Sequence, residues 1–447
     1  MFLKTGNGKI QNEEIENFFV ISVFVEYHGK GFKMKMKKLV ALTLSATMLL
    51  SMTACGSEKD SKKKAGVDAS KVESIYDALK LADDYTTGNY TTEIDMTIEE
   101  AGQEVGINAT VSGKKDGANG TADAGITVNF DGTKISFDFD DIFTVADGRL
   151  YIDADNAIES VTGNDDTEFG SYGLLLPEVD EDKQEEIRTD VMELYIDMLE
   201  ASLEGVDVEE DDGTFTVKVE EVDEFKSVVD NFVNYLDENK EDVADTMNGM
   251  LNGIAENVDY EQYINDLFDD ISEDLISAVG VLGGELTEDN LEEVKQEAID
   301  SINVTVDEFD VSEIETLVSE YADLNEDEFE AGFEELDKHS FELEVTATED
   351  KYVISGSFDI EGNGTVIKGT ISYTFEVDDV NVEAPDNAKT LTEMAEWGKE
   401  NTDILDEVVA DFQNSMLYSL FAGSLGGGDD VIIYDEDISD DYEDYEE

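Results

Sequence analysis

The chain has 447 residues, of which 113 are acidic and 28 are basic, and its formal net charge is −85 at pH 7. Nucleic acids and anionic membrane surfaces repel a protein of this charge, which excludes DNA and RNA as ligands. Hydrophobic residues nevertheless make up 40% of the chain, including 22 Phe and 17 Tyr, and this content predicts folded units with the acidic residues on their surface.

An export signal precedes the acidic body of the chain. Three lysines form a positively charged region, and the apolar run 39–50 follows them directly. This run is too short to span a bilayer, and the combination is typical of a secretory signal. We therefore interpret residues 34–54 as a signal peptide. Residues 1–33 are then an upstream extension, with the true start at Met34 or Met36.

The signal ends in Met52-Thr53-Ala54-Cys55-Gly56, which resembles the lipobox of bacterial lipoproteins. The resemblance implies cleavage after Ala54 and a diacylglyceryl group on the thiol of Cys55. Two acyl chains, at about 0.8 kcal/mol per buried CH₂, anchor a protein stably on a membrane. We therefore expect a lipid-anchored protein on the extracytoplasmic face of the cell membrane. The alternative is an ordinary cleaved signal with an incidental cysteine.

Residues 55–70 form a polar, Lys-rich stretch that predicts a flexible tether. The folded body begins with a capping-box pattern at Ser70 and an apolar helical period, which predict a helix over about 71–85. From Tyr90 the period changes to two, as expected for half-buried strands. The segment 71–178 is therefore predicted to hold one helix and the N-terminal half of an antiparallel sheet.

Two Asp-Gly turns predict the register of this sheet, because such two-residue turns fix which residues of a hairpin face one another. They are Asp131-Gly132 and Asp147-Gly148. The cross-strand pairs that they predict are Ile126 with Phe137, Val128 with Ile135, Val145 with Leu150, and Phe143 with Ile152.

The segment 179–338 is predicted to be a helix-rich insertion. Apolar stripes at helical period run through it, and a hairpin turning at Asp211-Asp212-Gly213 interrupts them. Thr287 and Ser312 are predicted to begin two of its helices. The apolar stripes would either pack into a core or line a cavity for lipid, and the core is the default.

Alternation returns over 339–388 and predicts the second half of the sheet. The segment 389–422 has helical period again and forms the predicted C-terminal helical region. A Gly-rich linker and an acidic, Tyr-containing tail make up 423–447, and this composition predicts disorder.

A leading helix, a long meander with the sequence ADGRLYID at 146–153, and a last strand that leaves through Val382-Glu383-Ala384-Pro385 resemble the LolA-like and LprG-like (LppX-type) lipoprotein carriers. The resemblance covers about 71–155 and 341–395. It implies an α+β fold in which a curved antiparallel sheet, a half-barrel, packs on helices and can open an apolar cavity for acyl chains. The helical insertion is a departure from that family.

Catalytic and metal-binding patterns are not found in the sequence. His339 is the only histidine after the signal, and no G-x-S-x-G elbow accompanies it. A calcium loop starting at Asp153 would need glycine at its sixth position, where Ile158 stands. Carboxylate pairs occur at almost every spacing in so acidic a chain and carry no information. We therefore expect no catalytic residue, no cofactor and no metal site.

The sequence favours a non-enzymatic lipoprotein that binds or carries an apolar or envelope-derived ligand, with the membrane as its partner through Cys55. The alternative is an acidic structural or interaction protein of the cell surface that contacts a protein partner and binds divalent cations weakly. An acid-dependent hydrolase is a third, less favoured hypothesis. The identity of the ligand and the oligomeric state are left open.

Overall fold

The computed structural model describes residues 67–100, 103–130, 132–165, 167–256, 258–301, 309–322, 336–362 and 364–414. The export signal, Cys55, most of the tether and the acidic tail all lie outside the described residues, so the expectations about them stay predictions.

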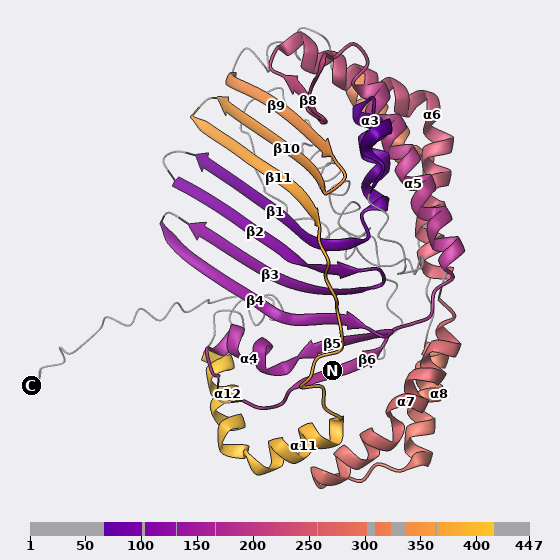
Figure 1. Cartoon of the computed structure of the whole chain (residues 1–447), viewed down its shortest axis with the longest axis vertical. Coiled ribbons are helices and arrows are strands. Elements are labelled where there is room, and N and C mark those ends of the chain that lie inside the picture. The colour runs from indigo at the N-terminus through magenta and orange to yellow at the C-terminus, as the bar shows by residue number, and fades with distance from the viewer. Residues whose placement is uncertain are drawn as a thin grey trace, which may run out of the picture.

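Eleven antiparallel strands form one large, curved sheet that does not close into a barrel (Figure 1). Its strand order is β6-β5-β4-β3-β2-β1-β11-β10-β9-β8-β7. The strands are β1 (Thr87–Glu100), β2 (Gln103–Asp116), β3 (Asn119–Phe130), β4 (Thr133–Ala146), β5 (Arg149–Asp153), β6 (Ser171–Leu175), β7 (Val208–Asp211), β8 (Thr214–Val219), β9 (Leu336–Ala347), β10 (Lys351–Gly362) and β11 (Thr365–Val377). With the helices beside it, this sheet confirms the predicted α+β class.

The two predicted halves of the sheet meet where β1 pairs with β11. This ladder runs from Gly88 opposite Val377 to Glu100 opposite Thr365. The hairpin β7–β8, which the helix-rich segment contributes, extends the same sheet because β8 pairs with β9. The helix-rich segment is therefore joined to the sheet through its own strands.

The registers predicted from the Asp-Gly turns are confirmed. Ile126 lies opposite Phe137, and Phe143 lies opposite Ile152. The second turn has the positive φ angles that a type I′ hairpin requires, 52° at Asp147 and 72° at Gly148. The hairpin turn at Asp211-Asp212-Gly213 is confirmed in the same way.

The described helices stand beside and below the sheet (Figure 1). They are η1 (Ala69–Lys71), α3 (Ile75–Lys80), η2 (Leu81–Asp84), α4 (Ala154–Thr162), α5 (Glu181–Ser202), α6 (Val222–Glu256), α7 (Tyr260–Val281), α8 (Glu288–Ser301), α9 (Val311–Ala322), α11 (Leu391–Glu400) and α12 (Thr402–Asn414). Helix α6 continues through a kink at Asn239, where φ is −116°. None of the described helices is long and apolar enough to cross a membrane.

Two predicted helix starts are wrong, and one is confirmed. Ser74, not Ser70, caps the first helix by accepting a hydrogen bond from the backbone of Asp77. Asp310, not Ser312, accepts the backbone N–H at the start of α9. Thr287, the residue before α8, accepts a hydrogen bond from the backbone N–H of Asn290, as predicted. The errors arise because several polar residues near a helix start are chemically able to cap it.

The main core lies between helices α3 and α5 and one face of β8–β11. It buries Leu79 of α3 and Ile196 of α5 against Val217, Val345 and Phe375 of the strands. Tyr85, just before β1, packs into this core and donates its hydroxyl to the carbonyl of Thr348 at 2.5 Å. Burial raises the pKa of Tyr85 to about 12, so the hydroxyl stays protonated at neutral pH.

A second core lies among the helices alone. Leu236 and Val243 of α6 pack with Ile314 of α9, and the partly buried Leu194 of α5 joins them. These apolar stripes therefore pack on one another, which is the default expected from the sequence.

The segment 378–390, which we call the strap, connects β11 to α11 across the front of the sheet (Figure 1). Hydrogen bonds hold it along its length, from Asn119 Nδ2 to the carbonyl of Val382 at 3.2 Å and from the backbone N–H of Ser171 to the carbonyl of Asn387 at 3.1 Å. Val382, within the strap, is buried. The sequence analysis did not predict β6 or the short helix α4, and both lie close to the anchored end of the strap.

Candidate functional site

The sheet has one apolar and one polar face over β1–β4. Directly paired residues of neighbouring strands point to the same face. One such row consists of Ile94, Ala109, Ile126 and Phe137, and the next consists of Met96, Ile107, Val128 and Ile135. The intervening row is polar, with Asp95, Asn108, Thr127 and Ser136. We call the first side the apolar face.

The apolar face is continuous with the main core but is exposed over β2–β5. The exposed fractions are 40% for Val111, 44% for Ile126, 39% for Phe143 and 39% for Ile152. Monomeric soluble proteins rarely leave contiguous apolar surface of this kind without a function. This exposed part of the face is therefore the first candidate site.

The reason for the exposure is where the helices pack. Helices α3 and α5 cover the apolar face at β8–β11, and the core cluster that they build contains no residue of β2–β6. Among described residues, the fully buried hydrophobic side chains of β2–β6 are Ile142 and Ala146. Ile142 and Ala146 alternate with Phe143 and Val145 along β4, and so they lie on the opposite face, where α4 packs.

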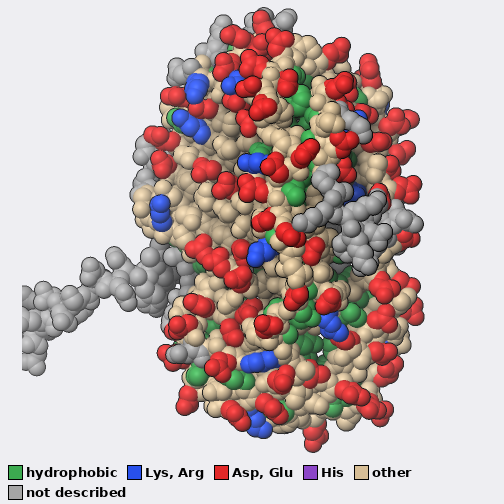
Figure 2. Space-filling view, viewed as in Figure 1, with side chains coloured by type: hydrophobic (Ala, Val, Ile, Leu, Met, Phe, Trp, Pro, Cys, Tyr) green, Lys and Arg blue, Asp and Glu red, His purple; other side chains and the backbone are tan. Residues whose placement is uncertain are grey.

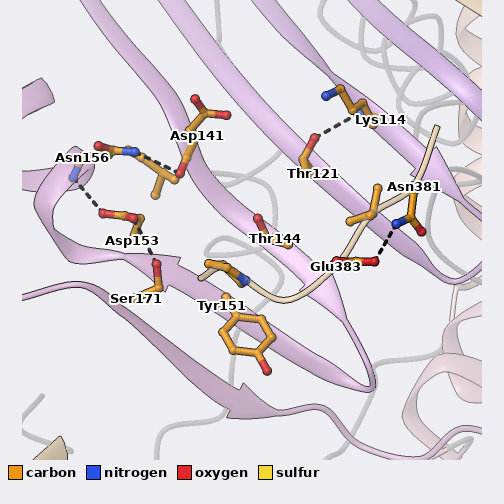
Figure 3. A pocket seen from close by; sticks show the side chains of 13 residues that line it. Lys114, Thr121, Asp141, Thr144, Tyr151, Asp153, Asn156, Ser171, Asn381 and Glu383 are labelled. Atoms are coloured by element: carbon orange, nitrogen blue, oxygen red, sulfur yellow. Dashed lines mark hydrogen bonds between the residues drawn. The ribbon is translucent and has the colours of Figure 1, made fainter. Parts of the chain in front are cut away.

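A polar pocket of about 270 Å³ lies on the other side of the sheet, between β4, β5 and the strap (Figure 3). Asp153 and Ser171 line one wall, and Asn381 and Glu383 of the strap line another. Asn156 donates its side-chain amide to the carbonyl of Asp141 at 3.2 Å. The pocket is lined by groups that hold the strap and the start of α4 in place, and this lining does not suit an acyl chain.

Asp153 is the centre of that polar cluster. It caps α4 by accepting the backbone N–H groups of Asp155 and Asn156. It also accepts hydrogen bonds from Ser171 Oγ at 3.0 Å and Asn387 Nδ2 at 2.7 Å. Burial raises the pKa of Asp153, but these hydrogen bonds outweigh burial, and the pKa is lowered overall. Its carboxylate therefore has a structural role, as a helix cap that also ties down the strap.

Helix α7 is fixed to the edge of the sheet beside this pocket. Arg149 of β5 forms a two-pronged ion pair with Asp270 of α7, with nitrogen–oxygen distances of 2.9 and 2.5 Å. The hydrogen bond and charge of Asp270 raise the pKa of Arg149, although burial opposes them. Tyr263 of α7 donates its hydroxyl to the carbonyl of Leu175 at 3.1 Å.

Neither a scan against protein-family profiles nor a search of characterised proteins finds a match to this chain. No family assignment follows from them. The site is therefore argued from its own geometry.

The residues singled out in the sequence have different outcomes. Cys55 and Ala54 lie outside the described residues. His339 is in β9 opposite Ile360 of β10. Asp153 caps a helix and does not begin a calcium loop. Among the described residues, no group of three or more His, Cys, Asp or Glu side chains is arranged to hold a metal ion.

The alternation that produces the apolar face is visible in the sequence, but its exposure is not. The signal is in the strands themselves, since β1–β4 alternate apolar and polar residues as regularly as β9–β11 do. Which half a helix covers depends on long-range packing, and local periodicity does not encode it.

Proposed function

We propose that this protein is a lipid-anchored, non-enzymatic lipoprotein of the extracytoplasmic face, and that its apolar face over β1–β5 binds an acyl-bearing ligand. The observation that carries the proposal is the exposure of Val111, Ile126, Phe143 and Ile152 on a face whose other half is covered by helices. Burial of such side chains contributes about 25 cal/mol per Å² of apolar area removed from water. A ligand with acyl chains gains this energy without requiring polar partners.

The curvature of the sheet also supports the proposal. A curved, unclosed sheet with helices on its apolar side is what the resemblance to the LolA-like and LprG-like carriers implies. The apolar rows of β1–β4 extend over about five residues in each strand, or roughly 17 Å at 3.3–3.4 Å per residue. Four strands at about 4.8 Å spacing make this surface about 14 Å wide. Such an area accommodates extended chains lying side by side.

Two double variants test the site. Val111→Asn with Ile126→Asn makes the apolar face polar at two diagonal neighbours, since Val111 pairs with Ala124 and Ile126 pairs with Ala109. The matched control is Thr110→Asn with Thr127→Asn, which places the same side chains on the same two strands but on the polar face. Both pairs keep the net charge unchanged.

Binding of a neutral hydrophobic dye and of lipid, measured by fluorescence and native mass spectrometry, distinguishes the two pairs. We expect the apolar-face pair to weaken binding by about tenfold or more, equivalent to about 1.4 kcal/mol, and the control pair to leave it unchanged. Wild-type protein that takes up neither dye nor lipid, or equal losses from both pairs, would contradict the proposal.

A further inference from the structure

The charge behind and beside the apolar face is strongly negative. Strand β1 contains four acidic residues and no basic residue. Glu93 and Asp95, on its polar side, lie opposite Thr110 and Asn108 of β2 and opposite Ser372 and Thr370 of β11, so no basic residue is directly paired with them. Helix α7, near the β5–β6 end, likewise contains acidic residues and no Lys or Arg.

Basic side chains in the described part of the chain offset only part of this charge, because each ion pair neutralises one carboxylate. Arg149 pairs with Asp270, Lys295 with Asp269, and Lys226 with Asp230. Each of these pairs is formally neutral, and the remaining carboxylates are uncompensated. In Figure 2, Asp and Glu side chains are scattered over the whole visible surface and clearly outnumber Lys and Arg.

This field acts on the headgroup of any ligand whose acyl chain lies on the apolar face. Surface potentials of several kT change the local concentration of a charged ligand by about 10-fold to 10³-fold. Only the thickness of one sheet separates the carboxylates on its polar side from a ligand on its apolar side, so their charge acts on that ligand at low salt, where the Debye length is about 30 Å at 0.01 M. A negatively charged headgroup is repelled there, and a positively charged headgroup is attracted.

We propose that the ligand is an amphiphile with a positively charged headgroup. Its acyl chain contacts the face over β1–β5, and its cation lies in the negative potential of the carboxylates behind and beside that face. The inference rests on the proposed function and adds a charge requirement to it. The same charge opposes association of two copies through this face, because each copy carries the same uncompensated carboxylates.

Three fluorescent probes test the requirement, with one acyl chain and either a trimethylammonium, a phosphocholine or a phosphoglycerol headgroup. They are titrated below their micelle concentrations into the full-length chain carrying Cys55→Ala, which removes the anchor. We expect the trimethylammonium probe to bind at least about tenfold more tightly than the phosphoglycerol probe at about 0.01 M salt. The ratio should fall towards one at about 1 M salt, where the Debye length is about 3 Å.

A pair of charge variants shows whether the preference belongs to this face. Glu93→Gln with Asp95→Asn removes two charges directly behind the face, and Glu293→Gln with Glu297→Gln removes two from the exposed side of α8. We expect the first pair to lower the cation-to-anion affinity ratio by about twofold to threefold more than the second. Equal effects of the two pairs would overturn the inference.

The remaining outcomes separate this inference from the proposed function. Equal affinities for the three probes, together with loss of binding in Val111→Asn/Ile126→Asn, would overturn the charge requirement and leave acyl binding intact. If none of the three probes binds, both the charge requirement and the proposed acyl binding are overturned. Two further outcomes would assign the face to a different occupant and overturn the inference. One is displacement of the bound probe when the protein dimerises at high concentration. The other is tighter binding of a cationic amphipathic peptide than of the trimethylammonium probe.

Discussion

At the scale of single residues, Gly113 of β2 lies opposite Tyr90 of β1, whose side chain crosses it to reach β3. Tyr90 of β1 lies across Gly113 and donates its hydroxyl to the carbonyl of Thr121 at 2.8 Å. A Cβ atom on Gly113 would lie 1.9 Å from that carbonyl oxygen and 2.8 Å from the Tyr90 hydroxyl. Only glycine fits this position without displacing backbone.

The variant Gly113→Ala should therefore destabilise the protein by about 1–3 kcal/mol, the usual cost of overpacking a filled site. The control is Gly249→Ala in α6, where an added Cβ meets nothing within 4 Å. Alanine in a helix is favoured over glycine by about 1 kcal/mol, so this control should be neutral or stabilising. Urea unfolding measures both. A Gly113→Ala protein as stable as wild type would contradict the close packing of β1–β3.

The predicted lipid anchor depends on the thiol of Cys55. Wild-type protein expressed in bacteria should incorporate radiolabelled palmitate, and Cys55→Ala should not, because the thiol is the acceptor that the lipobox resemblance implies. The substitution should also release the protein from the membrane fraction, since two acyl chains account for its attachment. Label entering both proteins equally would contradict this assignment.

Helix caps show the limit of local sequence information at this scale. Ser70 and Ser74 both precede the first helix, and only the second caps it. Asp310 and Ser312 present the same ambiguity before α9. Each candidate has the right chemistry, and the choice depends on the direction from which the chain enters the helix, which packing decides.

At the scale of elements, a residue of helix α7 caps the start of helix α11. The carboxylate of Asp274 in α7 accepts the backbone N–H groups of Leu391 at 2.6 Å and Thr392 at 2.9 Å. Burial raises the pKa of Asp274, but hydrogen bonds from the side chain and backbone of Thr392 and from Leu391 outweigh it, and the pKa is lowered overall. The contact ties the end of the strap to the helix-rich segment.

The variant Asp274→Asn should lower the free energy of unfolding by about 0.5–2 kcal/mol at neutral pH, the cost of losing a helix cap. Because the folded pKa lies below the unfolded value of about 3.9, this stabilisation is present above that value and is lost as the pH falls through the folded pKa. The difference in stability between the wild type and the variant should therefore begin to shrink below about pH 4 and vanish once the pH is below the folded pKa. Glu273→Gln, an exposed neighbour, is the control. A difference independent of pH would contradict the role of the Asp274 carboxylate.

Hairpins were predictable at this scale because their turns are local. The Asp-Gly turns fixed the registers of β3–β4 and β4–β5 within a few residues of chain. The short helix α4 and strand β6 were not predicted. Helix α4 packs mainly on β4, and β6 pairs with β5 and is bonded at Ser171 to the distant residues 387–389 of the strap. Helix α6 runs through the kink at Asn239 as one element.

At the scale of the whole molecule, the sheet is assembled by pairings that no local pattern specifies. β1 and β11 are separated by almost all of the folded chain, and the four described helices α6–α9 lie between β8 and β9 in the sequence. The sequence indicated two groups of strands and a helix-rich segment between them. It did not indicate that the hairpin β7–β8 would join the same sheet, because that depends on where α5 and α6 place it.

The exposed apolar face belongs to this scale as well. Alternation in β1–β4 predicted an apolar side, and only the packing of α3 and α5 on the other half of the sheet leaves that side open. The surplus of acidic residues keeps the molecule soluble despite the exposed patch, and net charge of one sign also opposes self-association. The proposal that this face binds acyl chains is thus a statement about the arrangement of the whole sheet.

Photocrosslinking tests that proposal most directly. A trimethylammonium lipid with a diazirine in its acyl chain is bound to the protein, irradiated, and the modified peptides are mapped by mass spectrometry. We expect the crosslinks to fall on β2–β5, at and around Val111, Ile126, Phe143 and Ile152, and to disappear when unlabelled lipid competes. Crosslinks confined to helices α7 and α8, or spread over the surface without competition, would contradict binding at the apolar face.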